Sequence, residues 1–201
     1  MQSIRNSIFK RISGGGRGRS YTSKDFFDLG SRAAVDQSLS RLARTGLMRR
    51  IKSGIYDFPR INPRLGGVLT PNMDDVVKSI ARKNNIRIMA SEAVAANRLG
   101  LSTQVPAQMI FLTDGPSKKI QINNFNIKFS HASPKRMSIC GTKSEMILQA
   151  LYYFGKSRVD DTMIKRISNM LSKEDKEHLI QDARFSPAWI ILVVNKIKGD
   201  K

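Results

Sequence analysis

The spacing of apolar residues predicts that a helix begins after Ser31 and ends at Gly46. Val35, Leu39 and Leu42 recur at intervals of four and three residues, which places them on one face of a helix. Ser31 is a favourable N-cap because its hydroxyl accepts hydrogen bonds from the free N–H groups of the first turn. The glycine at position 46 suits the left-handed conformation at which many helices end.

The residues that follow have the pattern of a small β-hairpin. Residues 47–51 and 55–58 predict two short strands, and the turn between them is Lys52-Ser53-Gly54. A helix followed directly by a basic hairpin is the last part of a winged helix-turn-helix. That fold places its recognition helix in the major groove of DNA.

The residues before this helix fit the same arrangement. Residues 2–13 carry an apolar stripe that predicts a first helix. Residues 24–29 predict a short second helix that packs through Phe26, Phe27 and Leu29. The order helix, short helix, turn, helix and hairpin therefore predicts an N-terminal winged helix-turn-helix.

A glycine-rich stretch, SGGGRGRS over residues 13–20, invites comparison with a phosphate-binding P-loop. It has no lysine before Ser20, its glycines are one residue too close, and a helical pattern rather than a strand precedes it. We interpret the stretch as a connector whose Arg17 and Arg19 can contact a DNA backbone.

Prolines and glycines between residues 59 and 70 predict a domain boundary. The expected fold class is α+β, with a winged helix-turn-helix over residues 1–66 and a mixed α+β domain with a small antiparallel sheet over 67–201. In the second domain the pattern predicts helices over 71–83, 91–99, 142–154, 159–171 and 173–183, and strands over 86–89, 108–113, 118–122 and 125–131. The last three strands are expected to form a meander, whereas residues 186–198 fit a helix or a strand.

The charge balance favours a polyanionic partner. The chain has 35 Lys and Arg against 16 Asp and Glu, a net charge of +19. Residues 1–66 carry 14 of the basic and 4 of the acidic side chains, so the charge is densest where the DNA-binding pattern lies. Charge that serves solubility alone is the alternative, but it would not require this uneven distribution.

Composition also indicates the compartment. The single cysteine, Cys140, permits no internal disulfide, and residues 1–13 lack the apolar run of a signal peptide. The longest apolar run, residues 188–194, is too short to cross a bilayer. We therefore expect a soluble cytoplasmic protein with no membrane partner.

The predicted recognition helix has a polar face opposite its apolar stripe. Gln37 can bond adenine in bidentate fashion, Ser40 is a permissive base contact, and Ala33 can meet a thymine methyl group. Arginines on the helix and cations on the hairpin are expected mainly at phosphates. The predicted DNA-binding residues are Arg17, Arg19, Arg32, Ala33, Gln37, Ser40, Arg41, Arg44, Arg49, Arg50 and Lys52. Asp57 is expected to pair with Arg49 or Arg50.

No catalytic constellation is evident in the sequence. His131 and His178, the only histidines, lie far apart and lack zinc-ligand spacing. Asp160 and Asp161 precede a helical pattern, so helix capping explains them. The sequence predicts no enzyme, no cofactor and no metal site.

Two blocks of sequence resemble a known family. The first block is DFFDLGSRAAVDQSLSRLARTGLMRRIKSGIYDFPR over residues 25–60, followed by LGG. The second block is MASEAVAANRLGLSTQVPAQMIFLTDG over residues 89–115, with the later SHASP. Together these blocks resemble the AbiEi-like antitoxins of bacterial type IV toxin–antitoxin (abortive infection) systems. The resemblance implies a winged helix that binds operator DNA and represses its own operon. It also implies a C-terminal domain that counters a nucleotidyltransferase-like toxin without a stable complex.

Two alternatives of other classes remain open from the sequence. The first is an interaction protein whose C-terminal domain binds a partner protein, with secondary DNA contacts and no toxin partner. The second is an enzyme that acts on nucleic acid through acidic residues of the C-terminal half.

Overall fold

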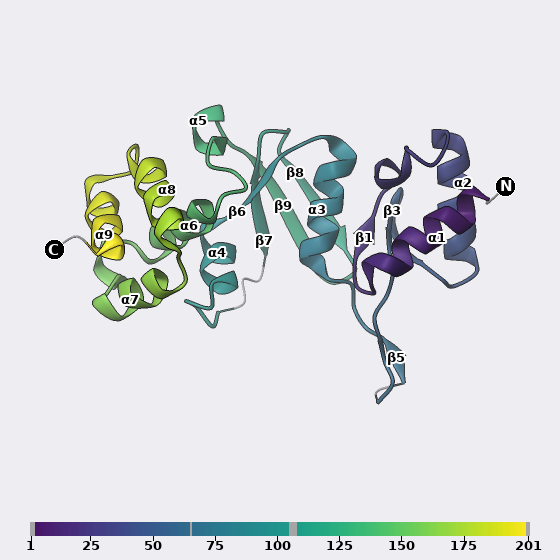
Figure 1. Ribbon diagram of the computed structural model, residues 1–201, viewed down its shortest axis with the longest axis horizontal. Coiled ribbons are helices and arrows are strands. Elements are labelled where there is room, and N and C mark those ends of the chain that lie inside the picture. The colour runs from purple at the N-terminus through teal and green to yellow at the C-terminus, as the bar shows by residue number, and fades with distance from the viewer. Residues whose placement is uncertain (1–2, 65, 105–107, 200–201) are drawn as a thin grey trace. The chain divides into compact units, whose positions relative to one another are not determined.

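The computed structural model describes residues 3–64, 66–104 and 108–199. The chain divides into two compact units, residues 1–86 and 87–201. Both units mix helices and strands, which confirms the α+β class (Figure 1). None of the helices in the described ranges has the length and apolar character needed to cross a bilayer.

The first unit contains three helices, a 3₁₀ turn and five short strands among its described residues. In chain order these are α1 (Ile4–Gly15), β1 (Ser20–Tyr21), η1 (Ser23–Phe26), α2 (Arg32–Arg44), β2 (Arg49–Lys52), β3 (Ile55–Asp57), β4 (Ile61–Asn62), β5 (Gly67–Val68) and α3 (Met73–Asn84). Strands β1, β3 and β2 form an antiparallel sheet in that order. Figure 1 shows α1 lying beside α2.

The core of the first unit confirms the predicted helix face. Val35, Leu39 and Leu42 of α2 are fully buried, in one cluster with Ile8 and Ile12 of α1. The side chain of the residue before α2, a serine, accepts from a backbone N–H of the first turn as its cap. The apolar stripe and the cap together fix which face of α2 remains exposed.

The short second helix differs from the expectation. It is one 3₁₀ turn, η1, in which Phe26 is fully buried whereas Phe27 is 44% exposed. Leu29 packs against the core from the turn that follows. The prediction that Phe27 packs was wrong: the 3₁₀ turn ends at Phe26, and Phe27 follows it as the C-cap with its side chain exposed.

The first unit extends beyond the boundary expected between residues 66 and 67. That position lies inside the β4–β5 hairpin, where Gly67 pairs with Asn62. Helix α3 packs on β1 and β3, and Arg82 donates to the Asp25 carboxylate at 2.9 Å and to the Ser20 carbonyl. The prolines and glycines therefore mark a hairpin, and the unit ends at Ile86. Residues 1, 2 and 65 of the predicted domain lie outside the described residues.

The second unit combines one sheet with a group of helices. Its elements are β6 (Ile88–Ala90), α4 (Glu92–Arg98), β7 (Met109–Thr113), β8 (Lys118–Ile122), β9 (Phe125–His131), α5 (Pro134–Met137), α6 (Lys143–Phe154), η2 (Lys156–Arg158), α7 (Asp161–Asn169), α8 (Lys173–Ala183) and α9 (Ala188–Lys198). The ambiguous segment 186–198 is thus helical. Helices α6 to α9 share one apolar core. Residues 105–107, in the block that carries the family resemblance, lie outside the described residues.

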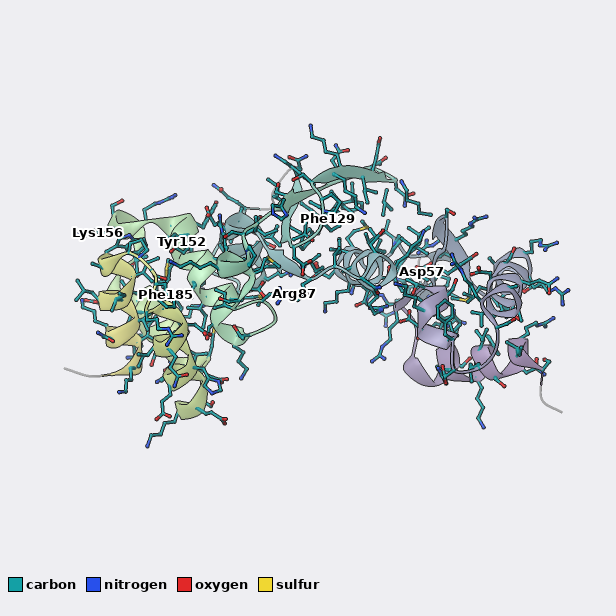
Figure 2. All side chains as sticks on the ribbon, turned by 90° about the horizontal axis from the view of Figure 1, so that it is seen from above. Asp57, Arg87, Phe129, Tyr152, Lys156 and Phe185 are labelled. Atoms are coloured by element: carbon teal, nitrogen blue, oxygen red, sulfur yellow. The ribbon has the colours of Figure 1, made fainter. Side chains whose placement is uncertain are left out.

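The sheet of the second unit is not the expected meander. Its order is β6-β7-β9-β8, and β9 runs parallel to β7 and antiparallel to β8. Ile127 and Phe129 of β9 are buried, and the Phe129 ring lies 6.1 Å from that of Phe111 on β7 (Figure 2). Strand β8 carries exposed Lys119 and Gln121, as suits a sheet edge. The more apolar β9 therefore takes the inner position.

Candidate nucleic-acid interface

The polar face of α2 is exposed, as its helical spacing requires. Ala33, Gln37, Arg41 and Arg44 are exposed, and Ser40 is half-buried. Since the opposite stripe is locked in the core, the rotation of the helix about its axis is fixed. These side chains are therefore held together on one surface of the unit.

A cavity of about 630 Å³ lies between α2 and the β2–β3 hairpin. Arg32 and Ser40 line it from α2, and Arg50 lines it from β2. The structure therefore brings together three residues of the predicted set that are up to 18 positions apart in sequence.

The acidic residue that lines this groove, Asp36, already has polar partners within the unit. Asp36 accepts a hydrogen bond from the Ser23 hydroxyl, and its other oxygen lies 3.8 Å from Arg32 Nε one helical turn away. The Arg32 side chain nevertheless remains 83% exposed. Its contact with Asp36 is therefore weak and open to competition by a phosphate.

Arg49 has a different role from its neighbours on the hairpin. It donates to both carboxylate oxygens of Asp57, at 3.0 and 2.6 Å, and to the Leu69 carbonyl at 3.0 Å. Asp57 is buried inside the unit with a side chain 1% exposed (Figure 2). Of the two partners expected for Asp57, the structure selects Arg49, and this leaves Arg50 to the groove.

The two arginines of the glycine-rich connector also differ. Arg17 donates to the Pro59 carbonyl at 2.9 Å, and its guanidinium lies 4.4 Å from the centroid of the Phe58 ring. Arg19 is exposed. The Arg17 contacts tie the connector to the end of β3, so this side chain has a structural role whether or not DNA is bound.

Sequence reasoning missed two lysines of the groove. Lys83 of α3 donates to the Ser53 carbonyl at the hairpin tip, at 2.6 Å, and Lys24 of η1 donates to Asn85. Both lysines line the same cavity. No local pattern signals them, since their partners are 30 and 61 residues away in sequence. They anchor the hairpin tip and η1 to α3.

The electrostatic balance of the first unit is strongly positive. Residues 1–86 carry 17 basic and 6 acidic side chains. Arg41, Arg44, Arg50 and Lys52 form no ion pair within the described part of the chain. Of these four side chains, Arg50 lines the groove. Exposed cations without an ion-pair partner attract polyanions and favour contacts with phosphates.

The histidines and the paired aspartates singled out in the sequence belong to the second unit. Among the described residues, no three His, Cys, Asp or Glu side chains are placed to hold a metal ion. In the second unit, His131 is exposed and its Nδ1 lies 3.1 Å from the Gly115 carbonyl. Asp160 accepts from the Met163 N–H as the cap of α7, as predicted.

Comparison with known proteins places the chain in one family. A family model described as a family of unknown function (DUF6088) matches residues 7–179. A search of curated proteins finds no match. The matched region includes the whole of the groove between α2 and the hairpin.

Proposed function

The chain belongs to the DUF6088 family, which has no assigned function, and from the residues of its first unit we propose that it is a sequence-specific DNA-binding transcriptional repressor. In this proposal the first unit is a winged helix-turn-helix. Helix α2 is the recognition helix, and the β2–β3 hairpin is the wing. The element order and the β1-β3-β2 sheet support this assignment.

One observation carries the proposal. Arg32 and Ser40 of α2 and Arg50 of the basic hairpin line the same groove, and Arg50 forms no ion pair within the described residues. A surface built only for solubility has no need to gather cations from a helix and a hairpin around one cavity. A DNA duplex uses both, because its groove takes the helix while its phosphates meet the flanking cations.

The residues divide by the kind of DNA contact. Gln37 and Ser40, on the exposed side of α2, are assigned to bases, with Ala33 as an apolar contact to thymine. Arg32, Arg41, Arg44, Arg50 and Lys52 are assigned mainly to phosphates, and Arg19 to the flanking backbone. Arg17 and Arg49 are assigned to positioning, since Arg17 contacts the Pro59 carbonyl and the Phe58 ring, and Arg49 donates to Asp57 and Leu69.

The test is binding to the chain's own upstream region, measured by fluorescence anisotropy at several salt concentrations. The protein should protect a defined footprint and bind this duplex more tightly than a scrambled duplex. The double variant Arg50→Ala with Lys52→Ala should weaken binding to both duplexes and reduce the slope of log K against log salt by about 2. Lys156→Ala with Lys173→Ala, two exposed lysines of the second unit, serves as the matched control. Equal affinity of the unaltered protein for both duplexes at physiological salt would overturn sequence-specific repression.

The resemblance to AbiEi-like antitoxins extends the proposal to a type IV antitoxin. In this role the protein represses its own operon and counters a nucleotidyltransferase-like toxin without a stable complex. Co-expression with the product of a neighbouring toxin-like gene tests it through growth rescue. Rescue by a variant that no longer binds DNA would assign the antitoxin activity to the second unit, whereas growth arrest with the unaltered protein would refute this extension.

A further inference from the structure

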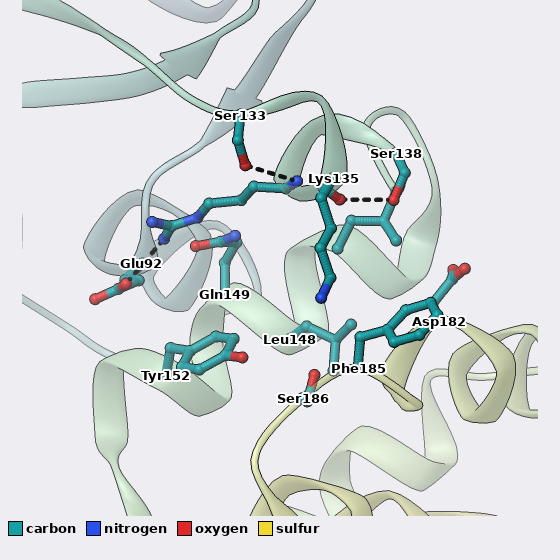
Figure 3. Close-up of a pocket in the computed structure, with 12 residues that line it drawn as sticks. Glu92, Ser133, Lys135, Ser138, Leu148, Gln149, Tyr152, Asp182, Phe185 and Ser186 are labelled. Carbon is teal, nitrogen blue, oxygen red and sulfur yellow. Dashed lines mark hydrogen bonds and ion pairs between the residues drawn. The ribbon is translucent and has the colours of Figure 1, made fainter.

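The second unit contains a cavity that the proposed DNA interface does not use. It has a volume of about 390 Å³ and lies between α5, α6 and the turn that follows α8 (Figure 3). Pockets of this size enclose small organic ligands. All of its lining residues belong to the second unit.

A buried amide on the wall of this cavity lacks a partner. Gln149 of α6 is 2% exposed, and its Oε1 accepts no hydrogen bond from the described residues. Its Nε2 has only the Met89 sulfur at 3.9 Å, which is a weak acceptor. A half-turn of the terminal torsion exchanges the oxygen and the nitrogen but leaves one polar group unsatisfied. Buried amides are normally bonded, so this one is available to a ligand.

Aromatic side chains and a free cation line the same cavity. Phe185 is 68% exposed and Tyr152 is 37% exposed, and the Arg184 guanidinium lies 4.8 Å from the centroid of the Phe185 ring. Lys135 places its Nζ 5.0 Å from the centroid of the Phe185 ring and forms no ion pair within the described residues. Figure 3 shows the Lys135 side chain directed toward Leu148 and Phe185.

The other charged side chains that line the cavity differ in whether they already have an ion-pair partner. Arg136 is held by Glu92, with Nη2 and Oε1 3.2 Å apart. Asp182 has no such partner within the described part of the chain. An anionic ligand is therefore attracted by Lys135 and repelled by Asp182, so the two residues allow the sign of the ligand charge to be tested.

We propose that this cavity binds a nucleoside monophosphate. The base contacts the Tyr152 and Phe185 rings and offers its N–H edge to Gln149, while the phosphate contacts Lys135 and the Ser186 hydroxyl. An aromatic carboxylate shares the ring and the charge but lacks the N–H edge. A free phosphate shares only the charge. The three chemistries are therefore separable by the choice of probe.

The experiment is isothermal titration of the full-length protein with AMP, GMP, guanosine, benzoate and inorganic phosphate. A monophosphate should bind with 1:1 stoichiometry, and guanosine, benzoate and phosphate should each bind at least tenfold more weakly. Lys135→Ala and Phe185→Ala should each weaken nucleotide binding about tenfold. Asp182→Asn should tighten it because the repulsion is removed.

Two controls separate this site from the general basic charge of the protein. Lys156→Ala removes an exposed lysine outside the cavity and should leave nucleotide affinity unchanged. Gln149→Met keeps the size of the side chain and should reduce the preference for nucleotide over benzoate. Thermal melting checks that each variant is folded. Absence of nucleotide binding at millimolar concentration, or equal losses in Lys135→Ala and Lys156→Ala, would overturn the proposal.

Discussion

Arg49 and Asp57 face each other across the β2–β3 hairpin, with Arg49 Nη2 2.6 Å from Asp57 Oδ2. The carboxylate is almost completely buried, and the guanidinium reaches the surface with 31% of its side chain exposed. A third N–H group, on Nη1, donates to the Leu69 carbonyl. The pair therefore connects the hairpin to the segment before α3 and determines which hairpin arginine is available to a partner.

We predict that Arg49→Ala and Arg50→Ala have different consequences. Arg49→Ala leaves the Asp57 carboxylate buried without a counter-charge, which should lower the free energy of unfolding by about 3 kcal/mol. Arg50→Ala removes an exposed side chain and should change it by less than about 0.5 kcal/mol. Urea denaturation of both variants measures the difference. Equal effects would contradict the division between a structural and a DNA-contacting arginine.

Gln37 provides a test of base recognition. Gln37→Ala should reduce discrimination between the footprinted duplex and a scrambled one by about 1–3 kcal/mol, because a bidentate contact to one base is lost. Arg41→Ala, one turn further along the exposed face of α2, is the matched comparison. It should weaken binding to both duplexes alike, since it is assigned to a phosphate. Competition binding at fixed salt measures both effects, and unchanged discrimination in Gln37→Ala would remove this residue from the base contacts.

The local features of the first unit could be predicted from the sequence because neighbouring residues determine them. The Ser31 cap, the Val35 stripe and the turn at Gly54 each depend on a few adjacent positions. These local features predict α2 and the hairpin at their observed positions in the sequence, and they predict which face of α2 is polar. For the same reason Ala33, Gln37, Arg41 and Arg44 are exposed on that face, and Ser40 is half-buried.

The remaining features depend on contacts between distant segments. Lys83 reaches Ser53, and Arg82 reaches Asp25, so α3 belongs to a unit that the glycine and proline pattern ended too early. The inner position of β9 in the sheet of the second unit likewise depends on how β7, β8 and β9 pair with one another, and these strands are separate segments of the chain. Neither arrangement leaves a local signal in the residues involved.

The position of α3 predicts how the chain can be divided. Val76, Val77 and Ile80 are buried, and α3 packs on β1 and β3. A fragment of residues 1–86 should therefore melt cooperatively, whereas a fragment of residues 1–66 should melt at a lower temperature or without a cooperative transition. Circular dichroism during heating distinguishes the two. Identical melting of both fragments would restore the earlier boundary.

Asp175 predicts a specific dependence of stability on pH. A hydrogen bond from Lys143 Nζ at 2.6 Å, together with hydrogen bonds from the Ser172 backbone and side chain, lowers the pKa of Asp175 from 3.8 to about 2. Because the unfolded chain takes up the proton first as the pH falls, this carboxylate stabilises the folded state fully above about pH 4. The contribution is lost between that pH and about pH 2.

The measurement compares the melting temperatures of Asp175→Asn and the unaltered protein between pH 2 and pH 7. The unaltered protein should melt at a higher temperature at pH 7, and the difference should decrease as the pH approaches 2. Glu174→Gln, an exposed neighbour in the first turn of α8, removes the same charge without the Lys143 contact and should give a smaller difference at pH 7. A difference for Asp175→Asn that is independent of pH would show that hydrogen-bond geometry, rather than the charge of Asp175, stabilises the start of α8.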